Sequence, residues 1–148
     1  MNRRATIDSS APVDAEDLYQ LYTSVGWVAY TRDRDALATA IGNSTYVVTA
    51  RDGNELIGLA RGMSDDVSIF YLQDILVRPE WQHRGVGRSL LENCLTRFSH
   101  VRQKVLLTDD LPSQHRFYES IGFADTRRIS NVNLHAFVQI SGIVFEQA

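Results

Sequence analysis

The stretch from residue 72 to residue 91 constrains the fold of this chain more than any other segment. Residues 72–77 form an apolar run that predicts a buried strand. Pro79 breaks it, because proline has no amide hydrogen to donate to a neighbouring strand. Residues 82–87 form a loop with two glycines, and an amphipathic helix is predicted to begin near Val86. A strand, a loop of unbonded amides and a helix N-terminus together favour an anionic phosphate ligand.

The spacing of this loop excludes two common phosphate sites. A dinucleotide-binding fingerprint needs a third glycine where Leu90 stands. A P-loop needs Gly-Lys-Ser/Thr, whereas this chain has Gly87-Arg88-Ser89 in a shorter loop. The spacing Gln/Arg-x-x-Gly-x-Gly resembles the pyrophosphate loop of acyl-CoA acyltransferases, and the chain therefore resembles the GNAT N-acetyltransferase superfamily. The simpler alternative is a turn with two glycines that only connects a strand to a helix.

A second motif strengthens the resemblance. The segment Phe117-Tyr118-Glu119-Ser120-Ile121-Gly122-Phe123 is similar to the GNAT motif Phe-Tyr-x-x-x-Gly-Phe. Phe117 and Phe123 are expected in the core, and Gly122 is expected to end a short helix. The resemblance implies that Tyr118 approaches the sulfur of CoA and donates to it as it leaves. Ordinary packing is the alternative for Tyr118.

Size and charge bound the remaining possibilities. The chain has 148 residues, so residues 1–148 are expected to form a single domain. The formal net charge of −3 argues against nonspecific nucleic-acid binding and against binding to an anionic membrane surface. One cysteine excludes an internal disulfide framework and fits a cytoplasmic protein. No apolar run approaches the length of a membrane span.

The pattern along the chain predicts a mixed α/β fold. Strands are expected at residues 3–8, 45–50, 56–61, 67–77, 101–108, 123–128 and 134–140, and helices at residues 13–25, 32–41, 86–98 and 114–120. Thr31 is expected to cap the second helix after an aromatic connector at residues 27–30, and residues 62–66 to form a loop. This order resembles the GNAT acyl-CoA N-acyltransferase fold, with about seven strands and about four helices on both faces of the sheet.

The resemblance implies acetyl-CoA as the acyl donor. The pantetheine arm would lie along the strand edge at Ile75, Leu76 and Val77, with the amide of Val77 or Ile75 on the thioester oxygen. The pyrophosphate would bind the loop, whose expected cofactor-binding residues are Gln82, His83, Arg84, Gly85, Val86, Gly87, Arg88 and Ser89. Arg84 and Arg88 would add charge there, although each is equally explained as a surface cation.

The general base is left open by the sequence. An alkyl amine with a pKa near ~10.4 must lose a proton before it attacks a thioester. Asp74 is unusual inside a strand, and strict alternation would place it on one face with Leu72 and Leu76. Burial between leucines disfavours a charged carboxylate unless it is partnered. Asp74 is therefore predicted to be either the base or a structural hydrogen-bond acceptor.

Residues on the acceptor side carry two interpretations each. Trp27 and Tyr30, with Tyr22, would line the pocket of the amine or pack in the core. Asp109 and Asp110 would hold a cationic acceptor, or shape a turn or a helix cap.

No metal site is expected, because no histidine pair has metal-ligand spacing and Cys94 stands alone. The predicted activity is acetyl transfer to a primary amine of a small molecule or peptide, and a non-catalytic acyl-CoA sensor is the alternative. The resemblance also implies a possible homodimer through the late strands and the apolar segment 143–145.

Overall fold

The computed structural model describes residues 3–147. The chain separates into two compact units, of which one ends at Leu107 and the other begins at Thr108. A single domain over residues 1–148 stays a prediction. Within the described residues, no helix is long and apolar enough to cross a membrane.

The first unit is built on a five-stranded sheet in the order β1-β2-β3-β4-β5. The strands are β1 (Thr6–Asp8), β2 (Tyr46–Asp52), β3 (Glu55–Ser64), β4 (Ile69–Val77) and β5 (Gln103–Leu106). The first four pair antiparallel, and β5 runs parallel to β4. The helices are α1 (Ala15–Ser24), α2 (Val28–Thr31), α3 (Arg34–Gly42), the 3-10 helix η1 (Pro79–Trp81) and α4 (Val86–Arg97). The predicted mixed α/β fold is confirmed.

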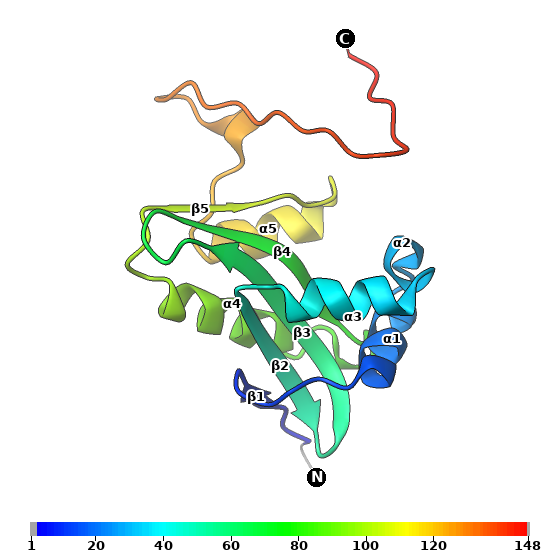
Figure 1. Ribbon diagram of the computed structural model, residues 1–148. Helices are drawn as coiled ribbons and strands as arrows, with labels where there is room; N and C mark the ends of the chain where they lie inside the picture. Colours follow the sequence, from blue (N-terminus) through cyan, green and yellow to red (C-terminus); the bar gives the residue numbers. More distant parts are fainter. Residues whose placement is uncertain (1–2, 148) are drawn as a thin grey trace. The chain divides into compact units, whose positions relative to one another are not determined.

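Helices cover both faces of this sheet, as predicted (Figure 1). On one face, α1 and α3 pack with Leu59 and Leu76 in a single apolar cluster. On the other, α4 lies close against β3, where a Cβ added to Gly58 would come within 3.2 Å of the Leu90 side chain. Phe98, at the end of α4, stacks on Phe70 of β4 with ring centroids 4.6 Å apart. The sheet is therefore a layer between two groups of helices.

A bulge in β4 changes which side chains share a face. Arg61 pairs with Asp74 and Gly62 pairs with Leu72, so Gln73 has no partner in β3. Such an extra residue interrupts the alternation of side chains along the strand. Leu72 is in regular register with Phe70 and faces α4, whereas Asp74 faces α1 and α2. The prediction that Asp74 shares a face with Leu72 is therefore wrong. Of its two expected neighbours, only Leu76 lies on the same face as Asp74, in the cluster with α1 and α3.

Several expected boundaries differ in the first unit. The aromatic connector contains helix α2, and Thr31 is its last residue rather than a cap. Asp33 caps α3 instead, by accepting from the amide of Ala36 at 3.0 Å. The predicted loop at residues 62–66 is partly strand, because β3 continues to Ser64. Local sequence did not reveal these shifts, since pairing with β4 extends β3 past Gly62.

The second unit contains α5 (Pro112–Ser120) and the 3-10 helix η2 (Thr126–Arg128). The two strands predicted at residues 123–128 and 134–140 are wrong, so the described residues hold five strands rather than about seven, and five α-helices rather than about four. Asp125 caps η2 by accepting from the amide of Arg127, which holds that segment in a turn. Residues 129–147 carry exposed apolar side chains, including Phe137 at 95% and Val144 at 93%. A strand needs a paired neighbour, and the described unit offers none.

Candidate functional site

The loop before α4 has the backbone conformation that a phosphate site requires. Gly85 precedes the helix with φ 82°, a left-handed value that glycine adopts without strain. The first helical hydrogen bond runs from the amide of Ser89 to the carbonyl of Gly85 at 3.0 Å. The amides of Val86 and Gly87 thus lie in the first turn, where helix amides have no partner within the helix. Ser89 was predicted to contribute its amide, and that amide is already bonded.

Side chains tie this loop to the end of β4. The amide nitrogen of Gln82 donates to the carbonyl of Val77 at 3.0 Å. His83 has a positive φ of 62°, which turns the chain ahead of Gly85. The Arg84 guanidinium lies over the ring of Trp81 at 5.2 Å, and Arg88 pairs with Glu92 at 3.3 Å. The two cations therefore flank the amides of Val86 and Gly87 in sequence.

One edge of β4 is open next to this loop. The ladder between β4 and β5 covers only residues 69–72, so in the described first unit residues 73–77 have no neighbouring strand on that side. The amide of Arg78 donates to the carbonyl of Ile57 in β3 at 2.8 Å. Because successive backbone groups alternate in direction, the amides of Ile75 and Val77 point away from β3, toward the open edge. Leu76 points its amide the other way, toward β3.

Asp74 lies at the centre of a buried polar network on the other side of this strand. Its carboxylate accepts from the Tyr22 hydroxyl at 2.8 Å, the Tyr30 hydroxyl at 2.7 Å and the Arg61 Nε at 2.6 Å. Only 3% of Asp74 and 4% of Arg61 are exposed. Gln73 donates to the Tyr30 oxygen at 3.2 Å. The network joins α1 and α2 to β3 and β4.

Electrostatics fix the direction of these hydrogen bonds. Burial, followed by the charge of Asp74, raises the pKa of Tyr22 well above its usual range. Burial also raises the pKa of Tyr30. Burial acts to lower the pKa of Arg61. The hydrogen bond to Asp74 and the negative charge of Asp74 outweigh burial and raise the pKa of Arg61. Both tyrosines are therefore protonated donors at neutral pH, and Arg61 is a cation.

Arg61 is the residue of this network that sequence reasoning missed. Its guanidinium also donates to the Ser44 hydroxyl at 3.2 Å, and to the carbonyl of Ala40 near the end of α3 at 3.5 Å. One signal was present, since arginine stands directly after the apolar run of β3. A charged residue is rarely buried unless it is paired, so a buried Asp74 required a cation of this kind.

The aromatic residues predicted for the acceptor side lie beside this network. Trp27 and Tyr30 are half-buried and pack against the core cluster of α1 and α3. The ring of Tyr30 lies 5.1 Å from that of Tyr22 and 6.0 Å from that of Trp27. Tyr22 is fully buried at 0% exposure. Trp27 and Tyr30 thus combine a packing role with surface that remains available to a ligand.

The second unit holds the other predicted site residues, Tyr118 and Asp109. Tyr118 is 8% exposed and packs on Phe117 and Phe123, with ring centroids 5.0 and 6.1 Å away. Burial raises the pKa of Tyr118 to about 12, so its hydroxyl stays protonated at neutral pH. Asp109 is exposed. Neither it nor Asp110 caps α5, because Leu111 occupies the capping position without a side-chain bond.

Asp110 instead belongs to a polar cluster of the second unit. It contacts His115 at 3.0 Å and Arg127 at 3.2 Å. Asp125 contacts the same two residues at 3.5 and 3.0 Å. The cluster joins α5 to η2 and accounts for the position of Asp110.

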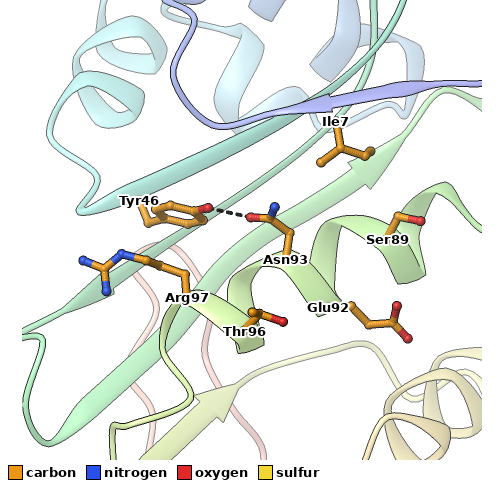
Figure 2. A pocket seen from close by; sticks show the side chains of 7 residues that line it. All are labelled: Ile7, Tyr46, Ser89, Glu92, Asn93, Thr96 and Arg97. Atoms are coloured by element: carbon orange, nitrogen blue, oxygen red, sulfur yellow. Dashed lines mark hydrogen bonds between the residues drawn. The ribbon is translucent and has the colours of Figure 1, made fainter.

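A shallow groove of about 460 Å³ lies between α4 and the strands β1 and β2, where Ile7 and Tyr46 line it. Figure 2 shows Ser89 in this groove with Glu92 and Asn93, and the Tyr46 hydroxyl donating to Asn93 at 2.5 Å. The carboxylate of Glu92 makes the groove a poor site for phosphate. Cys94 of the same helix is buried, and burial raises the pKa of its thiol to about 12. Within residues 3–147, no three metal-ligating side chains gather as a metal site.

Comparison with known proteins gives consistent results. A family model described as "Acetyltransferase (GNAT) domain" matches residues 21–140. An uncharacterized N-acetyltransferase of Pyropia yezoensis is 26% identical and aligns with 79% of this chain and 68% of its own. A protein of Glycine max named histone acetyltransferase is 32% identical over 78% of this chain, which spans only 54% of that relative. A GNAT-family acetyltransferase structure from Streptococcus pneumoniae TIGR4 has a TM-score of 0.79 and 28% identity, covering 94% of this chain and 99% of that one.

Proposed function

The chain belongs to the GNAT acetyltransferase family, and we propose that it transfers acetyl from acetyl-CoA to a primary amine of a small molecule or peptide. One observation carries the proposal. The open edge of β4, with the outward amides of Ile75 and Val77, leads directly into the first turn of α4, which holds the amides of Val86, Gly87 and Arg88. CoA combines a polar arm with an anionic pyrophosphate, and these two backbone features match it in that order.

The proposed reaction is a direct attack. The amine nitrogen forms a bond to the thioester carbon, and the carbonyl oxygen becomes an oxyanion that the amide of Ile75 or Val77 stabilises. The oxyanion then re-forms the carbonyl as the C–S bond breaks, the attacking nitrogen releases one proton to water, and the thiolate of CoA takes up a proton or a hydrogen bond. Tyr118 would donate it, because its raised pKa of about 12 keeps the hydroxyl protonated.

Asp74 is proposed to serve this reaction through its neighbours. Three donors already surround its carboxylate, and 3% exposure leaves little surface for a substrate. We therefore assign it the alternative role of holding Tyr30 in place, rather than removing the proton of the amine directly. Trp27 would provide apolar surface for the acceptor, and exposed Asp109 would meet a cationic part of it.

A cytoplasmic location and a homodimer are also proposed. A cytoplasmic location fits the single, buried Cys94. A homodimer would cover the exposed apolar side chains of the second unit, including Phe137 and Val144. Sedimentation equilibrium tests the dimer, and a monomer at micromolar concentration would contradict it.

Thiol release from acetyl-CoA, followed over a panel of amines, tests the activity. The panel includes a lysine-bearing histone peptide, because one relative is named as a histone acetyltransferase. Tyr118→Phe is expected to lower kcat at least about 10-fold with little change in CoA affinity. CoA binding without turnover of any amine would favour the sensor alternative, and failure to bind CoA would contradict both.

A further inference from the structure

The hydrogen bonds around Asp74 leave Tyr30 with a defined polarity. A carboxylate paired with Arg61 at 2.6 Å accepts hydrogen bonds and donates none. The hydroxyl proton of Tyr30 is therefore committed to Asp74, 2.7 Å away. Toward every other direction, the Tyr30 oxygen is able only to accept. A ligand that meets this oxygen must bring a donor.

Tyr30 is also the member of the network that reaches the surface. Tyr22, Arg61 and Asp74 are 0%, 4% and 3% exposed, whereas Tyr30 is half-buried. Two donors act on its oxygen: the buried Arg61 guanidinium and, on the exposed side, the Gln73 side-chain amide at 3.2 Å, a distance at the long end for a hydrogen bond. Gln73 is exposed, and as the unpaired residue of the bulge it has no partner in β3. Little holds its side chain in this position.

Tyr30 and Gln73 also lie where an acceptor would bind. Gln73 begins the open edge of β4, two residues before Ile75. We propose that the Tyr30 hydroxyl oxygen, oriented by Asp74, receives an N–H of the acceptor amine, and that this N–H displaces the Gln73 amide. This inference rests on the proposed function and makes Tyr30 and Gln73 specificity-determining residues, with Asp74 and Arg61 as positioning residues.

The surroundings define the chemical class of the acceptor. Arg61 compensates the charge of Asp74, so selection depends on the strength of the hydrogen bond that a donor makes to Tyr30 and not on attraction to Asp74. The ring of Trp27 lies 6.0 Å from that of Tyr30, at a tilt of 32°. Together they form an aromatic surface that suits an aliphatic chain. The acceptor is therefore a primary amine on an aliphatic chain, such as a diamine or a lysine side chain.

Calorimetric titration with a matched pair of probes tests the inference. The probes are 1,5-diaminopentane and 1,5-pentanediol, which share a chain length and differ in the terminal group. Each is added to the CoA-saturated protein. We expect the diamine to bind more tightly than the diol, because the ammonium makes a charge-assisted hydrogen bond. Tyr30→Phe is expected to weaken the diamine about 10-fold or more, since it deletes the acceptor of that bond.

Two further variants separate the roles. Gln73→Ala removes the competing donor and is expected to strengthen diamine binding about 2- to 10-fold. Tyr19→Phe is the matched control, because Tyr19 lies on α1 under Arg34, 3.5 Å from its guanidinium, and outside the network. It is expected to bind both probes as the wild type does. In turnover assays, Tyr30→Phe is expected to raise KM for the amine and leave KM for acetyl-CoA unchanged.

Equal diamine affinity in the wild type and Tyr30→Phe would overturn the inference. Weaker binding in Gln73→Ala would overturn the displacement of Gln73. The two proposals fail in different ways. Diamine binding that depends on Tyr30, without acetyl transfer, would support the inference and contradict the proposed enzyme. Acetyl transfer that Tyr30→Phe leaves unaffected would support the proposed enzyme and contradict the inference.

Discussion

The two halves of the candidate site in the first unit consist of different chemical groups. The half proposed for CoA consists of backbone groups: amides at the edge of β4 and in the first turn of α4, shaped by the left-handed Gly85. The half proposed for the acceptor consists of side chains from α1, α2, β3 and β4 that converge on Asp74. Backbone groups tolerate most side-chain changes around them, whereas a buried side-chain network depends on every member.

This difference has a consequence for how each half responds to substitution. Changes in the network should cost stability first, since they leave buried polar groups without partners. Changes in the loop should cost CoA affinity first, because the loop is exposed and contributes little to the core. Measurements of stability and of CoA affinity on matched variants test this difference between the network and the loop.

Arg61→Met should destabilise the protein most. It leaves Asp74 as a buried carboxylate without its cation, and breaking one partner of a buried ion pair costs about 3–5 kcal/mol. Urea unfolding measures the free energy. Arg51→Met is the control, because Arg51 forms a more exposed pair with Asp17 at 3.6 Å, and the expected loss is below about 1 kcal/mol. Similar losses in the two variants would contradict the importance of the network.

Tyr22→Phe should have the next largest effect. Its hydroxyl is buried and donates to Asp74 at 2.8 Å, so its removal leaves the carboxylate with one donor fewer and costs about 2 kcal/mol. Tyr30→Phe should cost about half as much, because water is able to reach the half-buried position. Thermal unfolding compares the two variants. A larger loss for Tyr30→Phe would show that the inner and outer tyrosines were assigned the wrong way round.

Gly85→Ala tests the backbone half. An alanine at φ 82° costs about 1–2 kcal/mol of stability, although the added Cβ meets no atom within 4 Å. Gly53→Ala is a matched control at φ 58 in the β2–β3 turn, also without a close contact. Both variants should lose similar stability, and only Gly85→Ala should weaken CoA binding in a calorimetric titration. Equal CoA affinities in Gly85→Ala and Gly53→Ala would contradict the binding of CoA by this loop.

The smallest effect is expected at a turn that belongs to neither half. Asp65 accepts from the amides of Val67, Ser68 and Ile69 between β3 and β4, and its bonds to Ser68 hold its pKa below the usual value. A depressed folded pKa adds stability that is fully present above the unfolded pKa near 3.8 and is lost progressively as the pH falls below that value toward the lower folded pKa.

Wild-type protein should therefore lose more stability than Asp65→Asn between pH 5 and about 3, as measured by urea unfolding at each pH. At pH 7, both variants should bind CoA and amine equally. The same pH dependence in the wild type and in Asp65→Asn would show that the charge of Asp65 does not stabilise this turn.

The same division explains what the sequence revealed. The loop, β4 and α4 were predicted because glycine and proline act locally on the backbone, and Gly85 and Pro79 mark where a strand stops and a helix begins. Asp74 was noticed, but its partners were not all identified, since Arg61 is 13 residues away and meets it only when β3 and β4 pair. The bulge at Gln73 depends on that same pairing.

The last two predicted strands failed for a related reason. Residues 134–140 have an apolar pattern that suits a strand, but a strand exists only with a neighbour to share its hydrogen bonds. In the described second unit these residues remain unpaired and expose Leu134 and Phe137. Pattern alone predicts the capacity for a strand, and tertiary pairing decides whether it forms.

Amide chemical shifts test the central claim most directly, which is that backbone groups of β4 and α4 hold CoA. CoA is added stepwise to ¹⁵N-labelled protein, and each backbone amide is followed separately. We expect the largest shifts at the amides of Ile75, Val77, Val86, Gly87 and Arg88, with little change at Leu76, whose amide points toward β3. Saturable binding that leaves these five amides unshifted would contradict it.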